Sequence, residues 1–229
     1  MGLRINTNVQ ALAAQRFLGV NNSNQNKSLE KLASGSRINK SGDDAAGLAI
    51  SEKLKASIRS LSQASRNAND GISLVQTAEG AMNEVSNILI RMRELSIQTS
   101  SDTVGTVERS FVDKEIQALK LEIDRISNST EFNGTKLLSG TAETLDFQIG
   151  INNNPTEDRI QFDSKNLATS IEAFQMSDIR NDTKEASQNN LITIDAAINK
   201  LNDNRSSLGA LQNRLQSTIN NLGIYRENL

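Results

Sequence analysis

Apolar residues recur at every seventh position along two long stretches of the chain. In the first, from about Ala45 to Thr99, the row is Leu54, Leu61, Ala68, Val75, Met82 and Leu89, with Ile58 and Ile72 at an intermediate offset. In the second, from about Ala186 to Leu229, the row is Ile194, Leu201, Leu208, Leu215 and Leu222. Its companion row holds Leu191, Ile198 and Ile219, with interruptions at Arg205 and Gln212. Such repeats are typical of helices packed along a seam, so we expect an antiparallel bundle.

The beginning of the chain carries a weaker pattern. An apolar series from about Val9 to Leu32 is diluted by Asn, Gln and Ser, and it predicts a helix of low intrinsic stability. A polar connector with two glycines follows from Ser34 to Asp44. Asp43 and Asp44 then stand where carboxylates cap the free N–H groups of the next helix. We favour capping over a divalent-metal site, because no histidine or further acidic cluster lies nearby.

The middle of the chain predicts a third helix and short β-hairpins. Apolar residues at helical spacing run from about Val107 to Ser127, after a polar break. The pair Asn133-Gly134 is a strong signal for a tight turn. Alternating residues at 145–151 and 159–162, separated by a segment with the single proline, predict β-strands. Residues 163–185 predict a loop with a short irregular element.

The fold class that these patterns predict is mainly α: an elongated antiparallel helical bundle or coiled coil with short β-hairpins in the middle of the chain. We divide it into an N-terminal helix and connector at 1–44, the first part of the bundle core at 45–180 and a returning C-terminal helix at 181–229. Gly71 and Gly80 lie inside the longest helix, and each costs about 1 kcal/mol relative to alanine. That helix therefore needs a packed seam, where small residues also permit close helix approach.

The seams alone are compatible with a self-contained bundle. The first predicted helix favours association instead, because its apolar residues have little within one chain to cover them.

The amino-acid composition excludes most kinds of catalytic and metal-binding site. The 229 residues include no histidine and no cysteine, which excludes Cys/His zinc sites, disulfides, thiol nucleophiles and a Ser-His-Asp arrangement. The net charge is −2 with no run of like charge, and aromatic residues make up only 3%. No stretch has the apolar length of a transmembrane helix, and the first residues lack the apolar region of a cleaved signal peptide. We expect no catalytic residue, cofactor, metal, nucleic-acid partner or membrane insertion.

Four segments resemble bacterial flagellins. The segment from Ser28 to Leu54 is similar to the N-terminal signature of that family. The opening residues 3–8, the segment 130–138 and the stretch 205–215 resemble the family as well. The resemblance covers nearly the whole chain.

This resemblance implies a structural subunit of the flagellar filament that assembles with other flagellin subunits as a homopolymer for motility. It implies an extracellular location, reached through the flagellar secretion apparatus with an export chaperone and without a cleaved signal peptide. Arg91, Leu95 and Glu115 match family positions that contact Toll-like receptor 5 or neighbouring subunits. Four residues apart, Arg91 and Leu95 are expected on one helix face.

The resemblance also leaves alternatives. Flagellins continue beyond the position of Leu229 into another helix that pairs with the N-terminal one, so we expect a truncated subunit. A hook–filament junction protein is the alternative within the flagellum, and the segments at Arg91 and Asn133 favour filament flagellin over it. A flagellin with a metalloprotease insert lacks its zinc ligands here, and a DNA-binding helical protein is disfavoured by the net charge.

Overall fold

The structure is a computed structural model that describes residues 8–141 and 144–229. The resemblance at residues 3–7 therefore lies outside the described residues. The chain divides into two units, Met1–Ser57 and Ile58–Leu229. Their boundary falls inside the longest helix, whereas the sequence suggested a division at 44/45.

The first unit contains helix α1 (Val9–Ser34) and the connector that leads into the next helix. The Asn8 side chain accepts a hydrogen bond from the N–H of Ala11 and caps the start of α1. Gly35, with φ of 64°, ends the helix in the left-handed conformation that glycine adopts without steric cost. The predicted first helix and its connector therefore both have counterparts in the structure.

The two aspartates of the connector have different roles. Asp44 Oδ1 accepts from the Gly47 N–H at 2.9 Å, which is the expected cap of the following helix. Asp43 instead accepts from the N–H groups of Asn39 and Lys40, at 3.3 and 3.4 Å. These bonds lower the pKa of Asp43, and the bond from Asn39 has the larger effect. The expectation that both carboxylates cap the helix is wrong for Asp43, because its side chain turns back to its own loop.

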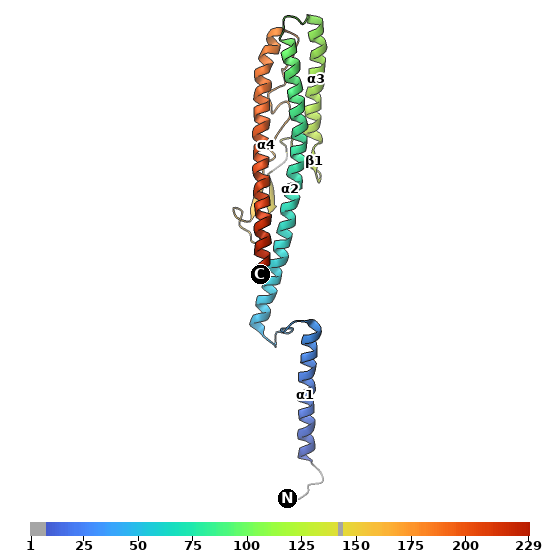
Figure 1. Cartoon of the computed structure of the whole chain (residues 1–229), viewed down its shortest axis with the longest axis vertical. Coiled ribbons are helices and arrows are strands. Elements are labelled where there is room, and N and C mark those ends of the chain that lie inside the picture. The colour runs from blue at the N-terminus through green and yellow to red at the C-terminus, as the bar shows by residue number, and fades with distance from the viewer. Residues whose placement is uncertain (1–7, 142–143) are drawn as a thin grey trace. The chain divides into compact units, whose positions relative to one another are not determined.

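The second unit is built on long helices that lie side by side (Figure 1). Helix α2 (Ala45–Thr99) has the predicted bounds, α3 spans Thr106–Ser129 and α4 spans Lys184–Glu227. One apolar core joins buried residues of all three helices with residues of the intervening segment. The mainly helical bundle expected from the sequence is confirmed.

Two small antiparallel sheets complete the second unit. Strands β1 (Glu131–Phe132) and β2 (Thr135–Lys136) are joined by Asn133 and Gly134, with φ of 50° and 78°. Positive φ at both central residues is the geometry of a type I′ hairpin turn, so the predicted tight turn is present and joins a hairpin that the sequence did not predict. Strands β3 (Leu145–Gln148) and β4 (Arg159–Phe162) pair with Leu145 opposite Phe162.

Residues 163–183 contain no helix or strand, yet they contribute a row of buried apolar side chains: Leu167, Ile171, Phe174, Met176 and Ile179.

The first row of each predicted seam is largely buried. Leu54, in the first unit, is half-buried. The other row members are at most 9% exposed: Leu61, Ala68, Val75, Met82, Leu89, Ile194, Leu201, Leu208, Leu215 and Leu222.

The second row of each seam differs from the prediction. The buried companions lie three residues after the first row, not four, at Ala64, Gly71, Ala78, Val85, Met92, Ala197, Asn204 and Leu211. Ile58 and Ile72 are only half-buried. Small side chains occupy much of the true row because neighbouring groups approach closely there. A Cβ on Gly71 would lie 3.3 Å from Leu215 Cδ1 and 3.4 Å from the Phe147 ring.

Candidate functional site

Helix α1 exposes its apolar side chains and buries none of its residues. Its large apolar residues are between 54% and 80% exposed: Val9, Leu12, Phe17, Leu18, Val20, Leu29 and Leu32. A helix without any buried side chain gains little from packing, and propensity alone stabilises such a helix only marginally in water. The exposed side chains of α1 therefore form a candidate interaction surface.

These apolar side chains lie on two sides of α1. At about 100° per residue, Val9, Ala13 and Val20 fall within about 40° of one another. Leu18, Leu29 and Leu32 fall on the opposite side of the helix. Apolar residues around most of a helix are typical of a helix with partners on several sides.

The residues carried over from the flagellin resemblance meet at the α2–α3 face. Arg91 on α2 donates to Glu115 Oε1 on α3 from Nε and Nη2, at 3.1 and 3.0 Å, and from Nη1 to Glu94 Oε2 at 3.2 Å. Both hydrogen bonds raise the pKa of Arg91, and the bond to Glu115 has the larger effect. The side chains of Arg91 and Glu115 are 51% and 44% exposed, so the pair is accessible.

Leu95 does not share this surface. It is 2% exposed and belongs to the core between the helices. Arg91 and Leu95 are one turn apart, but Leu95 is buried in the core whereas the Arg91 side chain is 51% exposed. The expected common exposed face of Arg91 and Leu95 is therefore not formed within this subunit.

A buried polar cluster at the α2 C-terminus was not anticipated from the sequence. Arg109 on α3 donates from Nε to the Thr99 carbonyl and from Nη2 to the Ser101 carbonyl, both at 2.9 Å. Asn181 Nδ2 donates to Ser96 Oγ at 3.0 Å and to Thr99 Oγ1 at 2.9 Å. These bonds satisfy groups at a helix end, where backbone carbonyls lack helical partners. No local pattern marks these residues, because their partners are brought together only by the fold.

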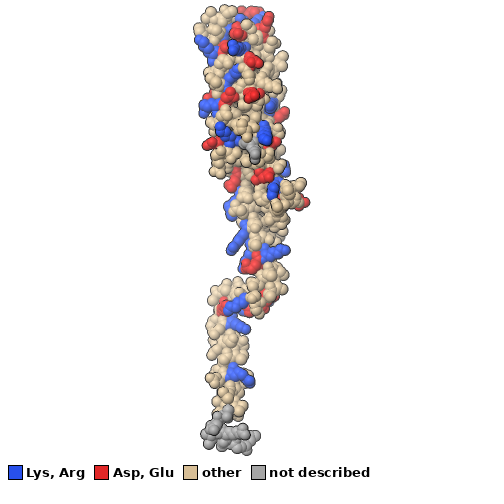
Figure 2. Space-filling model, turned by 180° about the vertical axis from the view of Figure 1, so that it is seen from behind, with Lys and Arg blue, Asp and Glu red and all other residues tan. Residues whose placement is uncertain are grey.

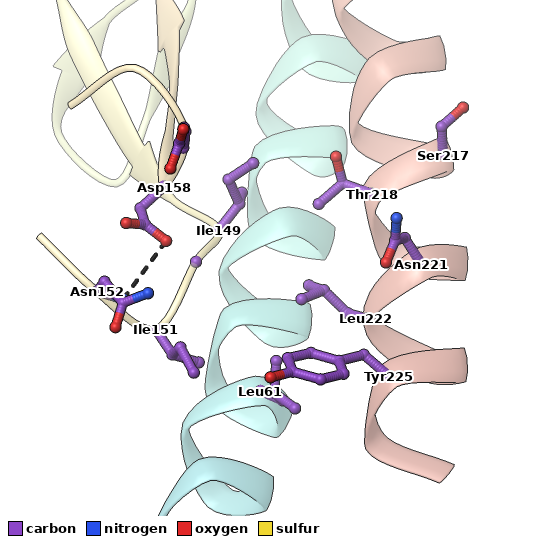
Figure 3. Close-up of a pocket in the computed structure, with 12 residues that line it drawn as sticks. Leu61, Ile149, Ile151, Asn152, Asp158, Ser217, Thr218, Asn221, Leu222 and Tyr225 are labelled. Atoms are coloured by element: carbon purple, nitrogen blue, oxygen red, sulfur yellow. Dashed lines mark hydrogen bonds between the residues drawn. The ribbon is translucent and has the colours of Figure 1, made fainter. Parts of the chain in front are cut away.

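A pocket of about 450 Å³ lies between the loop 149–158 and the facing parts of α2 and α4. Figure 3 shows Ile149 and Asp158 on the loop side, Leu222 and Tyr225 on α4, and Leu61 on α2. The Asp158 carboxylate accepts from the N–H groups of Asn152 and Asn154, at 3.4 and 3.0 Å. Asp158 therefore holds its own loop in place.

The charged residues form no extended patch of one sign on the face that Figure 2 shows. Lys and Arg side chains alternate there with Asp and Glu over the second unit. Across the described residues, no helix is both long enough and apolar enough to span a membrane.

Comparisons with known proteins identify the family. The bacterial flagellin N-terminal helical region matches residues 5–143, and the C-terminal helical region of flagellins matches residues 191–229. The chain is 46% identical to the flagellin of Halalkalibacterium halodurans over 227 residues, which cover 98% of this chain and 82% of that protein. The chain belongs to the bacterial flagellin family. As a member, it is a structural subunit of the flagellar filament, which lies outside the cell and serves motility.

Solved structures agree with this family. The crystal structure of Bacillus cereus flagellin is 30% identical, with a TM-score of 0.60 over 69% of this chain and 88% of that one. A putative flagellar hook-associated protein from Vibrio parahaemolyticus reaches a TM-score of 0.65 over 82% of this chain and 98% of that one, at 13% identity. That second likeness shows the fold alone, so it does not favour the hook–filament junction alternative.

Proposed function

We propose that this flagellin subunit assembles by covering the two apolar sides of α1 with neighbouring subunits. The observation that supports this is the set of exposed apolar side chains on a helix with no buried residue. Burying a Leu or Phe side chain contributes about 1.5–3 kcal/mol, so covering several of them stabilises the ordered helix in the filament and offsets part of the entropy cost of ordering it. The contacts run between different surfaces of successive subunits, and such heterologous contacts generate open helical filaments.

The test is seeded polymerisation followed by light scattering and electron microscopy. Phe17→Gln with Leu18→Gln should slow or abolish elongation, because both exposed side chains lose their apolar contact. Asn21→Gln with Asn22→Gln is the matched control on the same helix and should elongate like the wild type. Equal elongation of both double variants would refute the role of α1.

We also propose that Arg91 and Glu115 form a contact surface for Toll-like receptor 5. Two observations support this proposal: the resemblance to flagellins at these positions and the exposure of the ion pair. Arg offers a planar group with several donors, suited to recognition of a carboxylate or carbonyl on a partner. The alternative use of the same pair is contact between neighbouring subunits.

A receptor reporter assay on monomeric protein separates these uses. Arg91→Ala should reduce receptor signalling, whereas Arg125→Ala, which removes another exposed arginine paired three residues away, should not. Loss of polymerisation with full signalling in Arg91→Ala would assign the pair to subunit contacts. Leu95 is left intact in this test, because truncating a buried side chain would destabilise the subunit.

We further infer export by the flagellar secretion apparatus with an export chaperone, without removal of a signal peptide, and no catalytic activity. Family membership supports the route, and the lack of histidine and cysteine supports a purely structural role. The intact mass of the subunit recovered from shed filaments checks the export proposal: it should include the first residues of the chain.

A further inference from the structure

The tip of the β1–β2 hairpin presents an asparagine followed by a glycine to solvent. Asn133 and Gly134 are both exposed, and together they connect the two strands. They form the one Asn-Gly pair in the sequence. Because glycine has no side chain, its backbone nitrogen is the least hindered toward the side chain of the residue before it. The asparagine side chain is an amide, whose carbon such a nitrogen attacks.

Neither reacting group at this tip is held by another part of the subunit. Within the described residues, the Asn133 side-chain amide and the Gly134 N–H each lack a hydrogen-bond partner. A Cβ placed on Gly134 would meet nothing within 4 Å, so the surroundings leave room for the backbone to turn. Rotation about the backbone bonds of Asn133 can therefore bring the Gly134 nitrogen to the Asn133 Cγ without breaking a hydrogen bond of either group.

The hairpin itself opposes this rotation only weakly. Its strands contain two residues each, and a two-stranded hairpin is marginally stable by itself. Segments of this kind open locally at a small fraction of the global free energy of unfolding. The chain beyond the strands is anchored, because Leu137 and Leu138 are fully buried and the Leu137 N–H donates to the Thr130 carbonyl at 3.1 Å. Opening is therefore confined to the tip.

Two other positions offer the same chemistry in surroundings that prevent it. Asp70 precedes Gly71 inside α2, where the helix fixes the backbone and Gly71 is buried beside Leu215. Asn128 lies in α3, and its Nδ2 donates to the Asp124 carbonyl at 2.9 Å. Both positions require the opening of a packed helix, so the structure singles out the hairpin tip.

We propose that Asn133 is a site of spontaneous deamidation through a cyclic imide. The Gly134 nitrogen loses its proton to hydroxide and attacks the Asn133 Cγ, so that a new C–N bond closes a succinimide ring. The Cγ–Nδ2 bond breaks, and the amide nitrogen takes up a proton and leaves as ammonia. Water then opens the ring at either carbonyl carbon. The products are an aspartate in the normal chain and an isoaspartate linked through its side chain, with no oxidation or reduction.

Either product alters the tip and leaves the buried core in place. A carboxylate replaces a neutral amide, which adds one negative charge to the turn after Glu131 and Phe132. Isoaspartate also lengthens the main chain by one atom, so the two-residue turn no longer fits the pairing of Phe132 with Thr135. The reaction needs no enzyme, and its product accumulates with time. The modified fraction therefore records the age of a subunit.

The test is peptide mapping of the full chain during storage. Purified protein is incubated for several days in neutral and in mildly alkaline buffer, digested with trypsin and analysed by tandem mass spectrometry, with a sample digested at time zero as the reference. Trypsin cleaves after Arg125 and Lys136, so one peptide contains both Asn133 and Asn128. The mass shift from amide to acid should develop at Asn133 and not at Asn128. It should develop faster in alkali, and isoaspartyl and aspartyl forms of the peptide should separate by chromatography.

Two variants separate the effect of the structure from that of the sequence. Asp70→Asn creates a second Asn-Gly pair, inside α2, and this pair should stay unmodified while Asn133 converts. Asn133→Gln keeps an amide at the tip but requires a larger ring, so the shift should be lost there. Equal conversion at both pairs of Asp70→Asn would overturn the proposal, because the hairpin tip would have no special role. So would an unchanged Asn133 under conditions that convert the synthetic peptide 126–136, or a product without isoaspartate, since hydrolysis would then bypass the ring.

Discussion

Arg109 is a charged side chain that serves the interior of the subunit. It is 9% exposed, and its two hydrogen bonds go to carbonyl groups at and just beyond the end of α2. Arg109→Ala should lower the free energy of unfolding by about 2–3 kcal/mol, because it removes two charge-assisted hydrogen bonds, one of them to the carbonyl of Thr99 at the end of α2. Urea denaturation measures this. Arg125→Ala, at an exposed pair, should change stability much less, because exposed ion pairs contribute little. Equal effects would contradict the structural role of Arg109.

At the same end of the bundle, Asp102 ties the loop after α2 to the start of α4. Lys184 Nζ lies 2.7 Å from Asp102 Oδ2, and this hydrogen bond lowers the pKa of Asp102 below its ordinary 3.8. A lowered carboxyl pKa gives stability that is present above pH 3.8 and is lost as the pH falls through the lowered value. Thermal melts of wild type and Asp102→Asn should therefore differ slightly at neutral pH and converge in acid. Curves that diverge in acid would contradict this assignment.

Two of the three glycines in helix α2, Gly71 and Gly80, lie in different surroundings. A Cβ on Gly80 meets nothing within 4 Å, whereas one on Gly71 lies 3.3 Å from Leu215 Cδ1. Gly80→Ala should raise the free energy of unfolding by about 1 kcal/mol through helix propensity. Gly71→Ala should gain less, because Leu215 and Phe147 must shift to admit the methyl group. Denaturant titrations of both variants check the order, and a larger gain at Gly71 would refute the close contact.

The helices could be predicted because their cause is local. The heptad repeat and the polar break after Thr99 placed α2 at its observed bounds, and Asn133-Gly134 placed the first tight turn. The second row of each seam could not be read, because Ala64, Gly71 and Asn204 are not large apolar residues. Their burial follows from close approach between elements that are distant in sequence.

The candidate sites were less predictable than the helices. Arg91 and Glu115 were found through a family resemblance; in the structure they pair across α2 and α3, and their role as a contact surface stays a prediction. Leu95 shows the limit of helix spacing as a guide to exposure, because it is buried in the core while Arg91, one turn before it, is half exposed. The hydrogen-bond partners of Arg109 and Asn181 lie on other elements, so no local sequence pattern predicts these bonds.

At the scale of the whole molecule, the two units contrast in how they are stabilised. The second unit has a continuous apolar core with many side chains at or near 0% exposure. Helix α1 in the first unit has no buried residue. This contrast supports the proposal that the second unit folds by itself while α1 is completed by contact with neighbouring subunits.

Hydrogen–deuterium exchange of monomer and filament tests this central claim most directly. In the monomer, the amides of α1 should exchange rapidly, because no tertiary packing protects that helix, while buried segments of α2 and α4 exchange slowly. In assembled filaments, the α1 amides should become strongly protected, and the protection should centre on peptides containing Phe17 and Leu18. Fast exchange of α1 in filaments that form normally would contradict the account, since assembly would then leave the apolar sides of α1 uncovered.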